Sequence, residues 1–296
     1  MTPEIRSAKG TSWRSIITAC GLCAGLIFVA VLALASQGKE PQLLDEIVQE
    51  ATARQSAVET LRYEWETEET LQVGLVPGWD PTGGVVAPSG QPGGERTLNQ
   101  RWVLAIEGQR ARYQQEGEAF HLQQREPVPV HETGFWANGK LRANYNQQEE
   151  SVTEEPLWAG LSLRPVLEAY RLFDQEMGPA DRDAVTVLRR DQYGGHPCVV
   201  VQWLDTRGDG ESGTPWHWWL AEDMDYCVVR SQVLTEPGGW VLQEARMSYE
   251  PDPDPRIGWR LASWEGVWYH GPGQPRASFT ARVSEASLNV PVTVEP

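Results

Sequence analysis

Residues 61–75 read LRYEWETEETLQVGL, and this stretch decides the fold class. Apolar side chains hold most of its odd positions: Leu61, Tyr63, Trp65, Leu71, Val73 and Leu75. A period of two predicts a β-strand with one buried face and one solvated face. Thr67 and Glu69 interrupt the apolar series, so we expect a bulge or bend near them.

On either side of this strand the pattern predicts a few helices and many strands. Residues 43–61 show helical periodicity with one apolar face, and residues 157–173 form a second helical candidate that Pro165 interrupts or starts. Asn138-Gly139 lies between two extended segments, which predicts a tight β-hairpin. The chain then alternates through further strands at 185–190, 198–204, 216–220, 226–234, 240–249, 259–264 and 279–294. The predicted fold is therefore an α+β antiparallel β-sheet meander.

An uncharged run of 20 residues begins at Ile16 and ends at Ala35. At about 1.5 Å per residue it would span the hydrocarbon core of a bilayer. Basic residues precede it, so the N-terminus is expected in the cytoplasm and the remainder outside. The length favours a retained signal anchor, whereas Ala33-Leu34-Ala35 resembles a signal-peptide cleavage site. Either outcome places the protein in the cell envelope, anchored in the inner membrane with its domain in the periplasm, or released to the periplasm after cleavage.

These features predict four parts. Residues 1–15 form a cytoplasmic basic segment, 16–35 the signal anchor or signal peptide, 36–42 a linker, and 43–296 one extracytoplasmic domain. The domain is acidic, because the net charge of the chain is −16 while its first 35 residues are slightly basic. An acidic surface repels phosphate backbones, so we expect no nucleic-acid partner.

No motif indicates catalysis. The sequence lacks G-x-S-x-G, H-E-x-x-H, a P-loop and a dinucleotide-binding glycine pattern, and its five histidines are not spaced as metal ligands. The segment from Asp205 to Gly210 only half resembles a calcium loop, because Arg207 stands where a ligand oxygen is required. We therefore expect no enzyme activity, no cofactor and no metal; a secreted hydrolase is the least supported alternative.

The 14 tryptophans are the most informative side chains. Several lie in predicted strands, mostly on apolar faces, and two interpretations stay open. They fill an ordinary sheet–helix core, or they line a concave apolar cavity, since ligand sites are commonly apolar and aromatic. On the second interpretation the candidate lipid-binding residues are Trp65, Trp102, Leu104, Ile106, Trp203 and Trp218.

Cys198 and Cys227 are predicted to be free, buried thiols. In a meander the strand 216–220 lies between them, and two strand spacings amount to about 9–10 Å, which exceeds the reach of a disulfide.

The order of short motifs along the exported part resembles the LolA-like superfamily of periplasmic lipoprotein carriers and lipoprotein-sorting-like proteins. The export signal and helix lead to Tyr63 and Trp65, followed by the hairpin Ala137-Asn138-Gly139-Lys140. Further similar segments are Trp218-Trp219-Leu220 with Tyr226, Val228-Val229-Arg230, Glu265-Gly266-Val267-Trp268-Tyr269 and Leu288-Asn289-Val290-Pro291.

This resemblance implies a curved, half-open antiparallel β-barrel whose helices cover an apolar concavity. In the carriers that concavity accepts acyl chains, without catalysis. The expected partners are thus a lipid or lipoprotein acyl chain, and the membrane through residues 16–35. The alternative is a non-catalytic regulatory module on the same fold that binds a protein partner.

Overall fold

The structure is a computed structural model and describes residues 40–73, 78–79, 85–86, 94–121, 126–145, 151–153, 162–174, 177–178, 180–205 and 213–294. The predicted anchor or signal peptide at 16–35 lies outside these ranges. No helix within them is both long enough and apolar enough to cross a bilayer. Residues 1–46 and 47–296 form two separate units, and the second contains the sheet.

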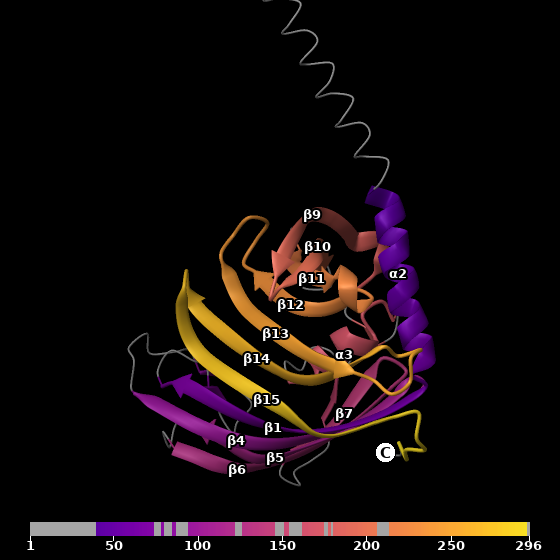
Figure 1. Ribbon diagram of the computed structural model, residues 1–296. Helices are drawn as coiled ribbons and strands as arrows, with labels where there is room; N and C mark the ends of the chain where they lie inside the picture. Colours follow the sequence, from indigo (N-terminus) through magenta and orange to yellow (C-terminus); the bar gives the residue numbers. More distant parts are fainter. Residues whose placement is uncertain are drawn as a thin grey trace, which may run out of the picture. The chain divides into compact units, whose positions relative to one another are not determined.

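One large open sheet dominates the second unit (Figure 1). Its main path runs β8-β7-β6-β5-β4-β1-β15-β14-β13-β12-β11-β10-β9, and the short strands β2 and β3 lie off this path. The strands are β1 Thr60–Gln72, β2 Gly78–Trp79, β3 Val85–Val86, β4 Glu95–Glu107, β5 Arg110–His121, β6 Glu126–Ala137, β7 Lys140–Tyr145, β8 Ser151–Thr153, β9 Val185–Tyr193, β10 His196–Asp205, β11 Thr214–Ala221, β12 Cys227–Leu234, β13 Val241–Pro251, β14 Trp259–Gly271 and β15 Gln274–Leu288.

The sheet is antiparallel, as expected, apart from a short parallel pairing of β2 with β5. It is not the single meander that the sequence predicted. Strand β1 pairs with β4 along one edge and with the last strand, β15, along the other, so that Leu61 lies opposite both Ile106 and Leu288. Two meanders, β4–β8 and β9–β15, therefore flank β1. The sheet is also not closed into a barrel, since β8 and β9 end the path.

Local sequence explains the turns and the curvature. Asn138 and Gly139 both have positive φ, 53° and 72°, which confirms the predicted hairpin between β6 and β7. The irregularity expected near Thr67 lies slightly earlier, where the β1–β15 register shifts between Glu64 and Trp65. Further shifts interrupt most pairings between β9 and β15, and such bulges increase twist. Figure 1 shows the resulting curve of the sheet.

In the part of the chain that the structure describes, two α-helices and two short 3₁₀ segments accompany the sheet: α2 Glu40–Ala57, α3 Arg164–Tyr170, η2 Arg182–Ala184 and η3 Glu222–Met224. Helix α3 is shorter than the predicted 157–173, of which 157–161 lie outside the described residues. Pro165 occupies its first turn, where a missing N–H costs no helical hydrogen bond.

Helix α3 lies inside the curve of the sheet, and its C-terminal end is tied to the second half of α2 (Figure 1). Arg54 of α2 donates to the Ala169 carbonyl at 3.4 Å, and Arg171 donates to the Val58 carbonyl at 2.8 Å. All seven residues of α3 are buried. The interior of this fold is thus the space between α3 and the concave face of the sheet.

The cysteine prediction is confirmed. Cys198 and Cys227 are free and buried, and Ala221 of β11 lies between them in register.

Candidate functional site

The concave face carries a first group of aromatic side chains on β1, β4 and β14. The register places Trp65 opposite Trp102, and their rings stack 6.0 Å apart with an interplanar angle of 5°. Trp264 tilts against Trp65 at 5.4 Å. Leu104 and Ile106 continue this face along β4 because they lie two and four residues after Trp102, on the same side of the strand. Four of the six predicted lipid-binding residues therefore share one surface.

A second aromatic group lies on β10 and β11. Trp203 is opposite Trp216 in register, and its ring stacks on Trp218 at 5.7 Å with an interplanar angle of 10°. Trp216 and Trp218 are two residues apart on β11, so both point to the same side of the sheet. The remaining two predicted residues, Trp203 and Trp218, thus belong to this second group.

Helix α3 contacts the sheet through polar side chains. The Arg164 guanidinium lies over the Trp216 ring, 4.3 Å from its centroid, and Trp218 Nε1 donates to Glu168 Oε1 at 3.0 Å. At the other end of α3, the Tyr170 hydroxyl is 2.6 Å from the Tyr63 hydroxyl of β1. One short helix therefore contacts the second aromatic group and, at its other end, Tyr63, which precedes Trp65 by two residues on β1.

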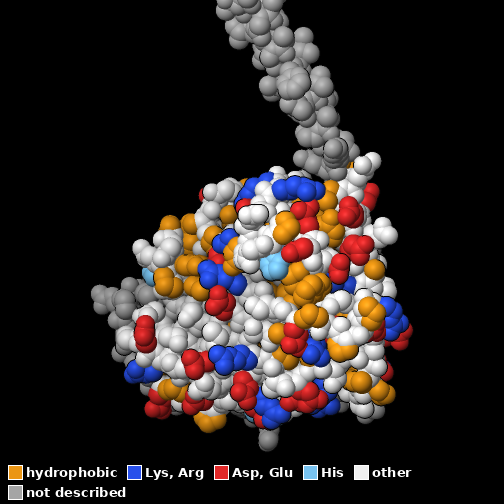
Figure 2. All heavy atoms as spheres, in the orientation of Figure 1, with side chains coloured by type: hydrophobic (Ala, Val, Ile, Leu, Met, Phe, Trp, Pro, Cys, Tyr) orange, Lys and Arg blue, Asp and Glu red, His pale blue; other side chains and the backbone are white. Residues whose placement is uncertain are grey.

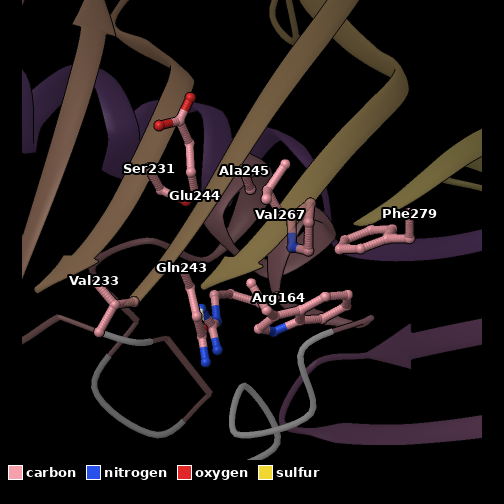
Figure 3. Close-up of a pocket in the computed structure, with 10 residues that line it drawn as sticks. Arg164, Ser231, Val233, Gln243, Glu244, Ala245, Val267 and Phe279 are labelled. Atoms are coloured by element: carbon pink, nitrogen blue, oxygen red, sulfur yellow. Dashed lines mark hydrogen bonds between the residues drawn. The ribbon is translucent and has the colours of Figure 1, made fainter. Parts of the chain in front are cut away.

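In this structure the aromatic face is packed. The six predicted residues expose between 0% and 8% of their surface. The hollow beside α3 has a volume of about 20 Å³ and is lined by Arg164, Pro165, Ser231, Val233, Gln243, Glu244, Ala245, Val267, Trp268 and Phe279 (Figure 3). Binding benzene takes a dry cavity of roughly 150 Å³, so an acyl chain enters this hollow only if α3 moves.

Arg164 and Glu168 give this interior its electrostatic character. Glu168 exposes 1% of its surface, and burial raises the pKa of its carboxyl to about 7, although the Arg164 charge and hydrogen bonds from Trp218 and Ser231 lower it. Burial also lowers the pKa of Arg164 to about 10, against the attraction of Glu168. A cation and a carboxyl of shifted pKa in an aromatic interior are typical of functional sites.

Sequence reasoning missed Arg164 and Glu168. Charged residues in a predicted amphipathic helix are expected on its solvated side, and the apolar side of this one is Leu161, Val166, Leu167, Tyr170 and Phe173. No sequence signal marks Arg164 and Glu168, because their burial comes from the position of α3 inside the curved sheet.

The outer face of β11, β12 and β13 carries ion pairs between charged side chains. Glu244 accepts from Arg230 at 2.9 Å and from Arg246 at 2.6 Å, and the Arg230 guanidinium lies 4.5 Å from the Trp219 ring centroid. Figure 2 shows basic and acidic side chains intermixed over the visible face, with no large field of one sign. Within the described ranges, no cluster of three or more His, Cys, Asp or Glu side chains could hold a metal.

Comparison with known proteins gives a likeness in fold. No family model matches the chain, and no curated protein matches its sequence. A DUF1329 family protein from Desulfovibrio piger superposes with a TM-score of 0.51 at 8% identity, covering 84% of this chain and 93% of that one. This chain shares its fold. The LppX lipoprotein of Mycobacterium tuberculosis aligns over 86% of this chain and 99% of its own at 10% identity, with a TM-score of 0.30. LprF of Mycobacterium bovis gives the same TM-score, identity and coverage of this chain, and 97% of its own.

At 8% identity the first likeness concerns architecture alone. The antiparallel sheet with helices agrees in part with the LolA-like resemblance, which implied a half-open barrel, whereas the sheet found here is open. Membership of that superfamily stays a prediction.

Proposed function

We propose that the chain is a non-catalytic, extracytoplasmic binding protein that accepts an acyl chain between α3 and the aromatic concave face of its sheet. The observation that carries this proposal is the contact of one seven-residue helix with the second tryptophan group through two buried ionisable side chains, Arg164 with Trp216 and Glu168 with Trp218. Burying ionisable groups destabilises this packing relative to that of an apolar helix. Less free energy is therefore lost when α3 moves to admit an acyl chain than when an ordinary core helix moves.

The attachment of α3 is uneven, which tells how it would open. Its C-terminal end is held by the Arg54 and Arg171 bonds and by Tyr170, whose hydroxyl also accepts from the Leu261 N–H at 3.1 Å. At its N-terminal end, Leu163 gives no side-chain cap, and Arg164 donates to Gln243 at 3.1 Å. We infer that the acyl chain enters beside the N-terminal end of α3, where a small outward shift of the helix about its C-terminal end widens the hollow that Arg164 lines.

Burial of the acyl chain is the favourable contribution to binding. It contributes about 25 cal/mol per Å², so roughly 300 Å² of buried chain yields about 7.5 kcal/mol before ordering costs. A dissociation constant of about 1 μM corresponds to a net gain of about 8 kcal/mol, so micromolar binding requires a larger buried area that also offsets the ordering costs and the movement of α3.

Photo-crosslinking tests the proposal. The full chain, held in nanodiscs of zwitterionic phospholipid, is exposed to a palmitate probe with a diazirine in its tail, and labelled peptides are mapped by mass spectrometry. We expect saturable labelling on β11 and β14, competed by unlabelled palmitate. Labelling that is not competed, or that occurs only outside residues 47–296, would reject the acyl-binding proposal.

A second candidate follows from the close packing of the aromatic face. A filled interior is what an interaction module on the same fold requires, because such a protein binds a partner with its outer surface. It becomes the better account if the crosslinking fails while the chain is folded.

The location is part of the proposal and is tested separately. A retained anchor at residues 16–35 keeps the protein in the membrane pellet through an alkaline wash, with a mature sequence that begins at or near Met1. A soluble product that begins at Ser36 would instead establish cleavage.

A further inference from the structure

We propose that the acyl ligand carries an anionic oxygen headgroup, a carboxylate or a phosphate, and that Arg164 binds it. This inference rests on the proposed function and specifies the ligand class. Arg164 lines the hollow beside α3 together with Trp268 and Phe279. It exposes only 8% of its surface, and its Nε–H finds no acceptor among the described residues. A guanidinium so deeply buried, with one N–H that finds no acceptor, can bind an anion that enters the hollow.

No carboxylate near Arg164 forms a direct ion pair with it within the described ranges. Glu168 lies on the same helix and attracts the Arg164 charge, but its Oε1 accepts from Trp218 rather than from the guanidinium. Glu244 also lines the hollow, yet its carboxylate points away from Arg164 (Figure 3) and forms ion pairs with Arg230 and Arg246. The guanidinium is therefore available to a ligand.

Glu69 of β1 lies beside a residue that lines the hollow. In register it lies opposite Phe279 of β15, and burial raises the pKa of its carboxyl to about 7. A proton on this side chain removes a charge that would oppose an entering anion. The acidic groups around the hollow are thus either turned away, bonded elsewhere or readily neutralised.

The geometry also fits an amphiphile rather than a free anion. One face of the guanidinium is taken by the Trp216 ring, 4.3 Å from its centroid, and Gln243 accepts from Nη1. The remaining N–H edge suits the paired oxygens of a carboxylate or phosphate. Pro165, Trp268 and Phe279 line the same hollow and would contact the first methylenes of the chain.

Headgroup discrimination tests this inference on the full chain in nanodiscs of zwitterionic phospholipid. Four probes share one diazirine-bearing 16-carbon tail and end in a carboxylate, a phosphate monoester, an alcohol or a trimethylammonium. In the native protein we expect labelling of β11 and β14 in the order anionic, neutral, cationic. A charge-assisted hydrogen bond corresponds to a preference of about tenfold or more for the anionic probes over the alcohol.

Arg164→Gln should reduce the anion-to-alcohol labelling ratio by about tenfold while alcohol labelling persists. Using this ratio cancels differences in partition of the probes into the disc. Arg189→Gln, which removes an exposed arginine 5.9 Å from the Trp219 ring, is the matched control and should leave the ratio unchanged. If Arg164→Gln does not fold, the native series still tests the preference for an anionic headgroup.

The outcomes separate the two proposals. Equal labelling by all four probes in the native chain, or an unchanged ratio in folded Arg164→Gln, overturns the anionic headgroup and leaves acyl binding intact. Preference for the carboxylate over the phosphate, or the reverse, identifies which anion is bound. Absence of competed labelling by any probe overturns acyl binding, and the headgroup inference with it.

Discussion

Replacing Glu168 by glutamine should stabilise the protein at alkaline pH and have little effect under acid conditions. Burial raises the pKa of this carboxyl from 4.5 to about 7, so the folded state holds its proton more tightly than the unfolded state. Below pH 4.5 both states are protonated and the group contributes its full stability. As the pH rises from about 4.5 to about 7, that contribution is lost, because the folded state must come to hold a buried charge.

A difference of about 2.5 pKa units corresponds to about 3 kcal/mol at roughly 1.4 kcal/mol per unit. Glutamine copies the neutral carboxyl in shape and can still accept from Trp218 Nε1. The free energy of unfolding of Glu168→Gln should therefore equal that of the native protein near pH 4.5 and exceed it by about 3 kcal/mol at pH 8. Because Glu168 is almost completely buried, solvent does not screen this effect.

Equilibrium urea unfolding followed by tryptophan emission, at several values between pH 4.5 and 8, measures the difference. Asp183→Asn is the control, because that side chain is 87% exposed, and it should show no such pH-dependent gain. A stability difference for Glu168→Gln that is constant across this range would refute the assigned burial. So would a variant that is less stable than the native protein at pH 8.

Three further predictions follow from the packing. Trp102→Glu should lower the free energy of unfolding by at least about 3 kcal/mol, because it empties a stacked core position and buries a carboxyl. A variant as stable as the native protein in urea would contradict the core placement of Trp102. Cys198 and Cys227 should resist iodoacetamide in the folded protein at pH 8, since burial raises the pKa of both thiols to about 11. Both should be alkylated in urea without reductant, because they are free thiols. A peptide mass showing a bridge between them would disprove the strand order. Tyr170→Phe should lower the free energy of unfolding by about 1–3 kcal/mol, because it leaves the buried Leu261 N–H without its acceptor. Hydrogen exchange at the Leu261 amide should also accelerate. Unchanged exchange would count against this hydrogen bond.

Much of the local structure could be predicted from the sequence. The alternation in residues 61–75 identified β1 and its buried face, and Asn138-Gly139 identified a hairpin, because only a tight turn with positive φ suits that pair. The separation of Cys198 from Cys227 by one strand was also predictable, since those strands are neighbours along the chain.

The tertiary structure alone decided which strand lies beside β1 on its second edge. Leu61 pairs with Leu288 across most of the chain, and alternation specifies which face of a strand is buried but not which strand is its neighbour. It also decided the candidate site. Arg164 and Glu168 read as ordinary helix-surface charges until the curve of the sheet encloses α3, because burial depends on what surrounds a helix and not on its own period.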